Sequence, residues 1–420
     1  FLSRLERAGK IVSSKVVSND VLGDLINDDG IAIEHEKIPF ISYPYEWSFP
    51  LLKEAALLHL DIHLQALDSG VTLSDASAYN VQFRGCQPIF IDILSFRKLR
   101  HGEAWEGHRQ FCEQFLNPLL MKAKVHLNPN AWYRGALEGI TPSEMNRLLP
   151  WYKKINRNIL LHVVLHASLQ NANVSAVASD MKKAVLPLAS YRKILISLMK
   201  WIEKLEPKKS KETEWENYSI SNSYANDEKL YKQEFIAKFS SSVSPNVLWD
   251  LGCNTGEFSR VALENGSKYS IGFDFDHGSI DLAFNNARQN NLQFLPLFLN
   301  ATNPSPNQGW NESERKSMSS RCNADGIIAL AFLHHLVFGR NVPLQDVVTW
   351  LVKLAPQGVI EFVPKSDPMI KQLLRFRDDI FSDYSEAAFV KFLSNHSKII
   401  ESKVVTESGR KLFWFHREVN

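Results

Sequence analysis

The chain has 420 residues, of which 45% are hydrophobic and 22% charged. These values are ordinary for a soluble globular protein, and the length predicts two domains, possibly three. The formal net charge of +2, with Lys and Arg dispersed along the chain, predicts neither a nucleic-acid nor a membrane partner. The longest apolar run, 327–333, is too short to cross a bilayer, and no signal peptide is visible.

The four cysteines are Cys86, Cys112, Cys253 and Cys322, and no two of them have C-x-x-C spacing. We therefore expect neither a zinc site nor a disulfide framework. Free thiols suit a reducing compartment, so the sequence favours a cytoplasmic location.

Apolar stripes in the first half of the chain predict helices over 51–67, 159–169 and 185–205. Between the first two lies Asp75, followed five residues later by Asn80, then a predicted hairpin, and then Asp92 after an apolar strand. This order resembles the catalytic and metal-binding loops of protein-kinase-like enzymes. In that family the first Asp orients a hydroxyl, and the Asn and second Asp hold Mg²⁺.

The first half also departs from the kinase pattern. No His-Arg precedes Asp75, no Phe-Gly follows Asp92, and no Gly-rich loop or phosphate-binding Lys is found in the first fifty residues. We therefore expect a kinase-like remnant that binds substrate or regulates, rather than an active kinase or a purely structural domain. No metal is predicted; Asn80 and Asp92 would hold one only if the kinase-like site is intact.

The best domain boundary is a charged, Pro-containing stretch that leads into a Ser/Asn/Tyr segment. It predicts a helix-rich kinase-like α+β domain at 1–205, a linker at 206–228 and a second domain at 229–420. Strands and helices alternate in the second domain, which indicates a parallel sheet covered on both faces. We expect helices at 229–240, 257–264, 278–290, 343–354, 368–380 and 385–395, and strands at 247–250, 269–274, 293–299, 325–331, 359–363, 398–405 and 411–416, the last two antiparallel.

The most informative stretch runs from Val247 to Gly256. An apolar strand ends in Asp250 and enters a loop with Gly252 and Gly256 before a helix begins at Glu257. Strand, tight loop and helix N-terminus form the usual entrance to a ligand site in an open α/β sheet. A carboxylate at the strand tip would repel a pyrophosphate, and the loop lacks G-x-G-x-x-G spacing. S-adenosylmethionine fits better, because it has a carboxylate for the loop and positive groups for Asp250.

The second predicted strand ends in Asp274 and is followed by Asp276. An acid about 20 residues beyond the first glycine is the position that binds ribose hydroxyls in doubly wound folds. Asp274 closes the strand and is the better candidate, whereas Asp276 is expected to cap the next helix.

These residues resemble the first two motifs of the class I S-adenosylmethionine-dependent methyltransferases. Asn254 stands where a middle glycine is more usual in that family, and Asn tolerates the left-handed conformation. The resemblance covers about 215–420 and implies a Rossmann-like seven-stranded methyltransferase sheet with S-adenosylmethionine as cofactor. It implies cofactor contacts at the following positions: Asp250, Gly252, Asn254, Gly256, Asp274, Asn300 and Ala301.

The family also implies that the tip of the fourth strand faces the transferred methyl group. His334 and His335 are expected at that tip as candidate bases, and Glu361, at the end of the fifth strand, as a candidate for substrate binding. The alternative is that one of the histidines packs in the core or caps a helix. For Asp274 and Asp276 the alternative is that both are solvated turn residues.

A narrower resemblance is to bacterial proteins related to a nodulation-associated methyltransferase of rhizobia. It rests on Tyr45-Glu-Trp-Ser-Phe, Asn80-Val-Gln-Phe, Asn303-Pro-Ser-Pro and Glu361-Phe-Val-Pro. Together the resemblances imply methyl transfer to a small-molecule or glycan-like acceptor. The alternatives are a bifunctional kinase/methyltransferase and a non-catalytic cofactor-binding protein.

Overall fold

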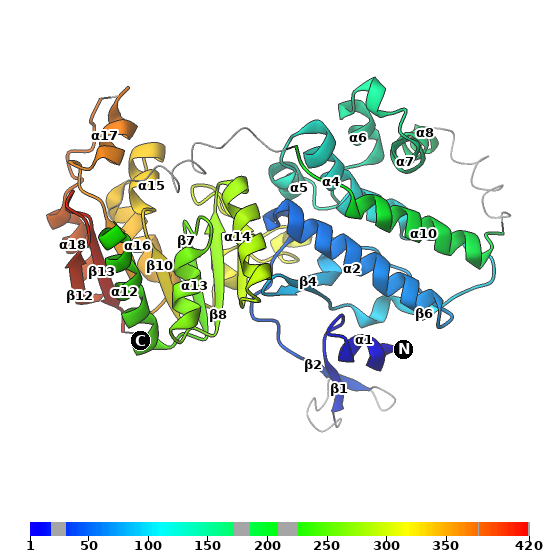
Figure 1. The fold of residues 1–420 in the computed structure, drawn as a ribbon, viewed down its shortest axis with the longest axis horizontal. Helices are drawn as coiled ribbons and strands as arrows, with labels where there is room; N and C mark the ends of the chain where they lie inside the picture. The colour runs from blue at the N-terminus through cyan, green and yellow to red at the C-terminus, as the bar shows by residue number, and fades with distance from the viewer. Residues whose placement is uncertain (18–30, 172–184, 209–225, 377, 419–420) are drawn as a thin grey trace. The chain divides into compact units, whose positions relative to one another are not determined.

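A computed structural model describes every residue except 18–30, 172–184, 209–225, 377 and 419–420. Two compact units make up the chain, Phe1–Lys209 and Ser210–Asn420 (Figure 1). The division falls inside the stretch expected as a linker, 206–228, most of which lies outside the described residues.

Small antiparallel strand pairs and one long helix open the N-terminal unit. The long helix α2 (Phe49–Leu67) follows the expected 51–67 closely and is buried along most of its length. The strand pairs are β1 (Ser14–Val17) with β2 (Ala32–His35), β3 (Val71–Leu73) with β6 (Phe96–Lys98), and the expected hairpin β4 (Val81–Arg84) with β5 (Gln87–Phe90).

Most of the other described elements of this unit are helical, and two of the described helices contain π-helical turns. Such turns are uncommon and frequent at functional sites. One runs through α3 (His108–Phe111), η6 (Cys112–Leu116), α4 (Asn117–Leu120) and η7 (Met121–Val125). The other runs through α7 (Arg157–Ile159), η9 (Leu160–Val164) and α8 (Leu165–Asn171). The remaining elements are α1 (Leu2–Arg7), η3 (Pro44–Glu46), η4 (Ala78–Asn80), η5 (Ile93–Ser95), α5 (Asn130–Gly135), α6 (Pro142–Leu148), η8 (Trp151–Lys153) and α10 (Leu188–Glu203).

The C-terminal unit is a Rossmann-like α/β domain whose described residues form a seven-stranded sheet in the order β12-β13-β11-β10-β7-β8-β9. All neighbours are parallel except that β13 runs antiparallel to both β11 and β12. The strands are β7 (Val247–Leu251), β8 (Tyr269–Asp274), β9 (Phe294–Phe298), β10 (Gly326–Ala329), β11 (Gln357–Phe362), β12 (Lys398–Val404) and β13 (Lys411–His416). The helices are α12 (Asn226–Val243), α13 (Glu257–Glu264), α14 (His277–Gln289), α15 (Leu333–Arg340), α16 (Leu344–Leu354), α17 (Pro368–Leu374) and α18 (Glu386–Ser394), with short turns η10 (Trp310–Glu312) and η11 (Ser319–Arg321).

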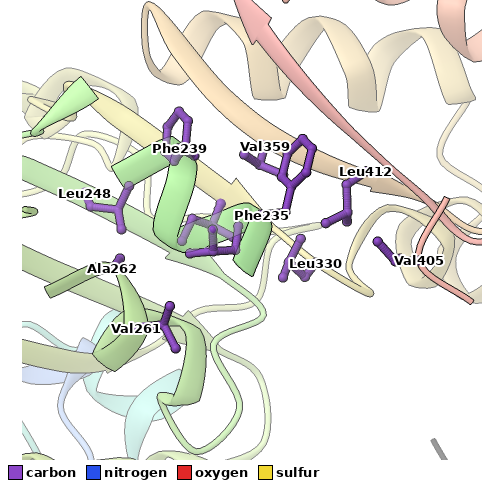
Figure 2. Packing of buried hydrophobic residues seen from close by; sticks show 11 residues of the cluster. Phe235, Phe239, Leu248, Val261, Ala262, Leu330, Val359, Val405 and Leu412 are labelled. Carbon is purple, nitrogen blue, oxygen red and sulfur yellow. The ribbon is translucent and has the colours of Figure 1, made fainter. Parts of the chain in front are cut away.

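One face of this sheet is sealed by α12 and α13. Figure 2 shows Phe235 and Phe239 of α12 among strand residues, with Val261 and Ala262 of α13 beside them. Their partners on the strands are Leu248, Ile328, Val359 and Leu412. Burial of such side chains stabilises the fold by roughly 1.5–3 kcal/mol each. This core therefore fixes the positions of the strands whose ends carry the candidate site.

Two expectations about elements near the strand ends are wrong. The fourth strand ends at Ala329 rather than 331, and a helix that was not expected, α15, begins at Leu333. The chain cannot extend the strand because Ala331 adopts a left-handed φ of 48°. Helix α17 ends at Leu374 rather than 380, and further along the chain Asp379 accepts from Lys365 and from the N–H of Phe381, a non-helical arrangement.

The order of the strands defines where a ligand belongs. The chain passes from β7 through β8 to β9 on one side and then crosses to β10 on the other side of β7. Ligands in open α/β sheets bind outside the carboxyl ends of the strands at this switch point. The loops after β7 and β10 therefore face the candidate site.

Candidate functional site at the carboxyl ends of the strands

The loop after β7 is held in a conformation that needs small residues. Gly252 and Gly256 have φ values of 80° and 83°, and Asn254 has φ 48°, as expected for an Asn in the middle position. A Cβ atom on Gly252 would lie 3.2 Å from the ring of Phe332, and one on Gly256 would lie 2.4 Å from the ring of Phe294. The loop therefore excludes larger side chains on both backbone and steric grounds.

This loop folds back over the end of β8. The N–H groups of Gly252 and Cys253 both donate to the carbonyl of Phe273, at 2.8 and 3.1 Å. The N–H of Asn254 donates to Asp274 Oδ2 at 2.8 Å. These bonds bring the glycine loop and the predicted ribose acid together, and the N-terminus of α13, which follows the loop, carries the positive end of the helix dipole.

Asp250 lies below this loop and is almost completely buried. Its Oδ2 accepts from the hydroxyl of Ser259 on α13 at 2.7 Å, and that hydroxyl accepts in turn from Ser270 at 3.0 Å. Burial raises the pKa of Asp250 to about 7, and the nearby Asp274 adds to this, although the bonds from Ser259 oppose it. Within the described residues no Lys or Arg pairs with either acid.

Asp274 is half-buried at the end of β8, and its two carboxylate oxygens have separate partners. Oδ2 accepts from Asn254, and Oδ1 accepts from the N–H of Asp276 at 2.9 Å. Burial raises the pKa of Asp274 despite these bonds. Asp276 caps α14 by accepting from the N–H of Ser279 at 2.8 Å, which confirms the role expected for it.

An exposed aromatic side chain follows directly after Asp274. Phe275 is 54% exposed. The guanidinium of Arg340 lies 5.8 Å from its ring centroid, and Phe298 lies 5.8 Å away on the neighbouring strand end. An aromatic face beside two acids was not expected from the sequence; its signal is a Phe in an otherwise polar loop.

The adjacent strand end carries the Asn300–Ala301 pair. The N–H of Leu299 donates to the carbonyl of Asp274 at 2.8 Å, so the residues after β9 continue next to the end of β8. Asn300 Oδ1 accepts from the hydroxyl of Thr302 at 2.8 Å, which fixes the turn. The structure thus brings Asn300 and Ala301 to the same edge as Asp274.

Glu361, at the end of β11, is fully buried and holds the loop after β10. Its Oε2 accepts from the N–H of Ala331 at 2.7 Å, and its Oε1 accepts from Lys232 at 2.7 Å. Both oxygens are occupied, so the expectation that Glu361 contacts a substrate is not supported. Its contacts instead fix the left-handed turn at Ala331 and hence the position of Phe332 over Gly252.

The carboxylate of Glu361 belongs to a buried ion-pair cluster. Arg410 binds Asp367 through two parallel bonds of 2.7 and 2.9 Å, and its other terminal nitrogen lies 3.8 Å from Glu361. The hydroxyl of Ser408 also donates to Asp367 at 2.7 Å. Burial pushes the pKa of Asp367 up, but the bonds from Arg410 and Ser408 outweigh it and the pKa is lowered. Lys232 and Arg410 balance the two acids, so this side of the site carries no net charge.

The two candidate histidines lie in the first turn of α15 and not at a strand tip, which corrects the expectation. His334 is fully buried, and His335 is half-buried with its ring 4.1 Å from that of His334. Burial lowers the pKa of both, that of His335 to about 4. Both imidazoles are therefore neutral near pH 7, and His335 alone of the pair keeps exposed surface.

The N-terminal unit brings its three singled-out polar residues together. The Asn80 side-chain amide donates to Asp75 Oδ2 at 3.0 Å and to Asp92 Oδ2 at 3.1 Å. The remaining oxygens cap local turns, Asp75 by accepting from Ser77 and Asp92 by accepting from Leu94. In this arrangement the residues brace the hairpin between them.

The fold and the edge of acids and glycines define a Rossmann-like α/β protein with a ligand site at its switch point. In sequence, the chain is 45% identical over 388 residues to the nodulation protein NoeA of Rhizobium meliloti strain 1021, covering 92% of this chain and 82% of that protein. The chain therefore belongs to the NoeA family. No protein-family model matches it.

Solved structures similar to part of the chain include the N-methyltransferase NodS from Bradyrhizobium japonicum WM9 (14% identity, 46% of this chain and 99% of that chain, TM-score 0.34). Another is the magnesium protoporphyrin IX methyltransferase ChlM from Synechocystis PCC 6803 with bound SAH (17% identity, 47% and 88%, TM-score 0.34). These scores are too low to bear on function. Among the described helices, none combines the length and apolar character needed to cross a membrane.

Proposed function

We propose that the chain is an S-adenosylmethionine-dependent methyltransferase. The proposal rests on one observation: two acids that no Lys or Arg of the described residues pairs with, Asp250 and Asp274, flank a glycine loop at the switch point of a Rossmann-like sheet. A dinucleotide pyrophosphate would be repelled there, whereas a ligand with a sulfonium and an ammonium is favoured.

Each part of the cofactor has a candidate partner in this edge. The N-terminus of α13, behind Gly256, suits a carboxylate. Asp274 suits ribose hydroxyls, and the exposed ring of Phe275 offers an apolar face to a purine base, with Asn300 and Ala301 beside it. Asp250, below the loop, favours positive charge above it.

S-adenosylmethionine supplies a methyl group on a sulfonium, which a nucleophile displaces in line. The chain has to orient the acceptor and exclude water, and these two effects supply most of the rate in such a reaction. The Glu361-held turn, with Phe332 over Gly252, forms the wall on the β10 side. If the acceptor is a hydroxyl or amine, we propose His335 as the base, since it is neutral and half-exposed.

We further propose that the acceptor is a small or glycan-like molecule. The near-neutral charge of the chain and the charge-balanced cluster around Glu361 favour an uncharged, polar acceptor over a polyanion.

The test is calorimetric titration of the full chain with S-adenosylmethionine and S-adenosylhomocysteine, followed by methyl transfer to extracted metabolites. Binding of both ligands together with appearance of a methylated product supports the enzyme. Binding without any product across the extracts would favour the non-catalytic cofactor-binding protein. Absence of binding would overturn the proposal.

We also propose that the N-terminal unit is a kinase-like remnant that does not phosphorylate. The meeting of Asp75, Asn80 and Asp92 across a hairpin supports a kinase-like ancestry. The sequence lacks a recognisable clamp for the β- and γ-phosphates, so any ATP would be held weakly and turnover should be negligible. Sustained ADP release with Mg²⁺ that disappears in Asp92→Asn would instead favour the bifunctional enzyme.

A further inference from the structure

Three side chains of metal-ligating type, His108, Cys112 and His162, meet in the N-terminal unit, and none of them belongs to the sites described above. The Nε2 atom of His108 lies 2.9 Å from Nδ1 of His162 and 3.7 Å from Sγ of Cys112. All three ligand atoms lie within 4.8 Å of one another, and no other group of this kind occurs among the described residues.

The distances between these atoms are close to those between the ligand atoms of a metal site. With Zn–N bonds of about 2.0–2.1 Å and a Zn–S bond of about 2.3 Å, tetrahedral geometry separates two nitrogens by about 3.3 Å and N from S by about 3.6 Å. The observed nitrogen–sulfur distance of 3.7 Å already has this value, and the nitrogen pair at 2.9 Å needs to open by a few tenths of an ångström.

A further imidazole, that of His166, lies one helical turn beyond His162, outside the group of three whose ligand atoms lie within 4.8 Å of one another, and a turn of its ring would be needed to make it a fourth ligand. The ring centroid of His166 is 4.6 Å from that of His108. His108 and Cys112 are separated by four residues, as are His162 and His166, so each pair shares one face of its helix. Paired ligands at this spacing on a helix are an established way of binding zinc.

The surroundings also suit a metal. Cys112 and His162 are buried, and the two helices that carry the four residues each contain a π-helical turn at this point, η6 and η9. Trp201 stacks on His162 with ring centroids 5.9 Å apart, and Trp105 lies 5.3 Å from His108. These rings exclude water from the cluster, and an apolar shell of this kind strengthens metal–ligand bonds.

We propose that His108, Cys112, His162 and His166 form a structural site for a zinc-like divalent ion. The ion would join the helix that begins at His108 to the helix that begins at Arg157. On binding, the Cys112 thiol releases its proton to solvent. The proton now shared between His108 and His162 moves to a ring nitrogen that faces away from the metal, so both imidazoles bind in the neutral form.

The test uses the full chain stripped with a chelator and then reconstituted with Zn²⁺ or with Co²⁺ as a spectroscopic probe. We expect one tightly held ion per chain and, with Co²⁺, tetrahedral absorption together with a thiolate-to-cobalt charge-transfer band. Cys112→Ser should remove that band and weaken Zn²⁺ binding by at least about 100-fold. His162→Gln should weaken binding similarly.

Two matched controls keep the result specific. Cys86→Ser removes another buried thiol of the same unit, and His101→Gln removes an exposed imidazole; both should bind like the unaltered chain. The Co²⁺ spectrum is measured first on the unaltered chain, so this part of the test does not depend on whether a variant folds. No bound ion after reconstitution, or a thiolate band that survives Cys112→Ser and disappears in Cys86→Ser, would overturn the proposal.

Discussion

Two neighbouring stretches of the same sheet edge treat buried acids in opposite ways. At the ends of β7 and β8, the bonds that Asp250 and Asp274 accept from the described residues come from hydroxyl and backbone groups. At the end of β11 and just beyond it, Glu361 and Asp367 are neutralised by Lys232 and Arg410. One stretch therefore has negative charge to offer to a ligand, and the other has none.

The two pairs of acids also differ in the direction of their pKa shifts. This difference distinguishes acids that could bind a ligand from acids that hold the fold around the site. Burial raises the pKa of Asp250 to about 7, whereas bonds from Arg410 and Ser408 outweigh burial and lower the pKa of Asp367. Unpaired buried acids destabilise a fold unless a partner arrives, and function is the usual reason for their presence. The paired acids brace the turn at Ala331, which a ligand would contact only indirectly.

Among changes at the acids and loop after β7 and β8, replacement of Gly252 by Val should have the largest effect on cofactor affinity. The φ of 80° and the 3.2 Å approach of Phe332 leave no room for a branched side chain, so the loop must shift. We expect the affinity for S-adenosylmethionine to fall by at least about 100-fold, or about 2.8 kcal/mol. Calorimetric titration of the full chain measures it.

The control for this change is Gly339→Ala. Gly339 lies in α15, and a Cβ atom there would meet nothing within 4 Å. This variant should bind as the parent does. Unchanged affinity in Gly252→Val would mean that the ligand does not approach the loop after β7.

Removal of a charge from the supporting cluster should instead reduce stability. Arg410→Met leaves Asp367 buried without its two-bond partner, which typically costs about 3–5 kcal/mol of unfolding free energy. Urea denaturation followed by far-UV circular dichroism measures the loss. The double variant Arg410→Met/Asp367→Asn should recover part of it, because the orphaned charge is gone.

The exposed pair of Lys365 and Asp379 provides the matched comparison. Lys365→Met should cost under about 1 kcal/mol, because water solvates the remaining carboxylate. If Arg410→Met is no more damaging than Lys365→Met, the cluster around Glu361 does not support the site.

The spacing of apolar residues, together with the Gly, Pro and Asn residues at element ends, predicted most of the fold of the C-terminal unit. The glycine loop, the start of α13 at Glu257 and the antiparallel last two strands follow from local chemistry that a single sequence displays. The end of β10 did not follow, since the turn at Ala331 depends on Glu361, thirty residues further along. An Ala with positive φ has no local signature.

The same limit applies to the site residues. Asp250, Asp274 and the glycine loop directly follow strands that the sequence predicts, so their place is visible in the sequence. The ion pair of Lys232 with Glu361 joins α12 to β11, which are far apart in the sequence, and no local pattern predicts it. His334 and His335 were placed at a strand tip because the preceding apolar run has no visible stop. The cluster around Cys112 was missed because only C-x-x-C spacing was considered, although its four-residue helical spacing was visible.

Asp274→Ala tests the binding acid nearest to the expected ribose. It should cost about 1.5–3 kcal/mol of cofactor binding, the range for a hydrogen bond to a charged group. Since Asp274 also accepts from Asn254 and Asp276, Asp274→Asn, which keeps one acceptor oxygen, should lose less. If Asp276→Ala weakens binding and Asp274→Ala does not, the ribose acid lies further along the loop.

The smallest expected effect concerns how the free energy of unfolding depends on pH, and it arises from Asp250. Its pKa is about 7 in the folded chain against an ordinary value of 3.8, so the folded state binds the proton more tightly than the unfolded state. Stability from this group is therefore present at low pH and lost as the pH rises through about 7. Between pH 6 and 8 the loss should be roughly 1 kcal/mol. Asp250→Asn should remove this slope, while Asp276→Asn, at the cap of α14, should keep it.

Cofactor binding should respond in the opposite direction, which separates a binding acid from a purely structural one. A cation placed near Asp250 stabilises its ionised form, so affinity for S-adenosylmethionine should rise between pH 6 and 8 and a proton should be released on binding. Asp250→Asn should therefore be more stable than the parent at pH 8 and yet bind more weakly. Calorimetry in buffers of different ionisation enthalpy measures the proton count. If Asp250→Asn gains stability and also binds with undiminished affinity, the buried carboxylate serves α13 through Ser259 and not the ligand.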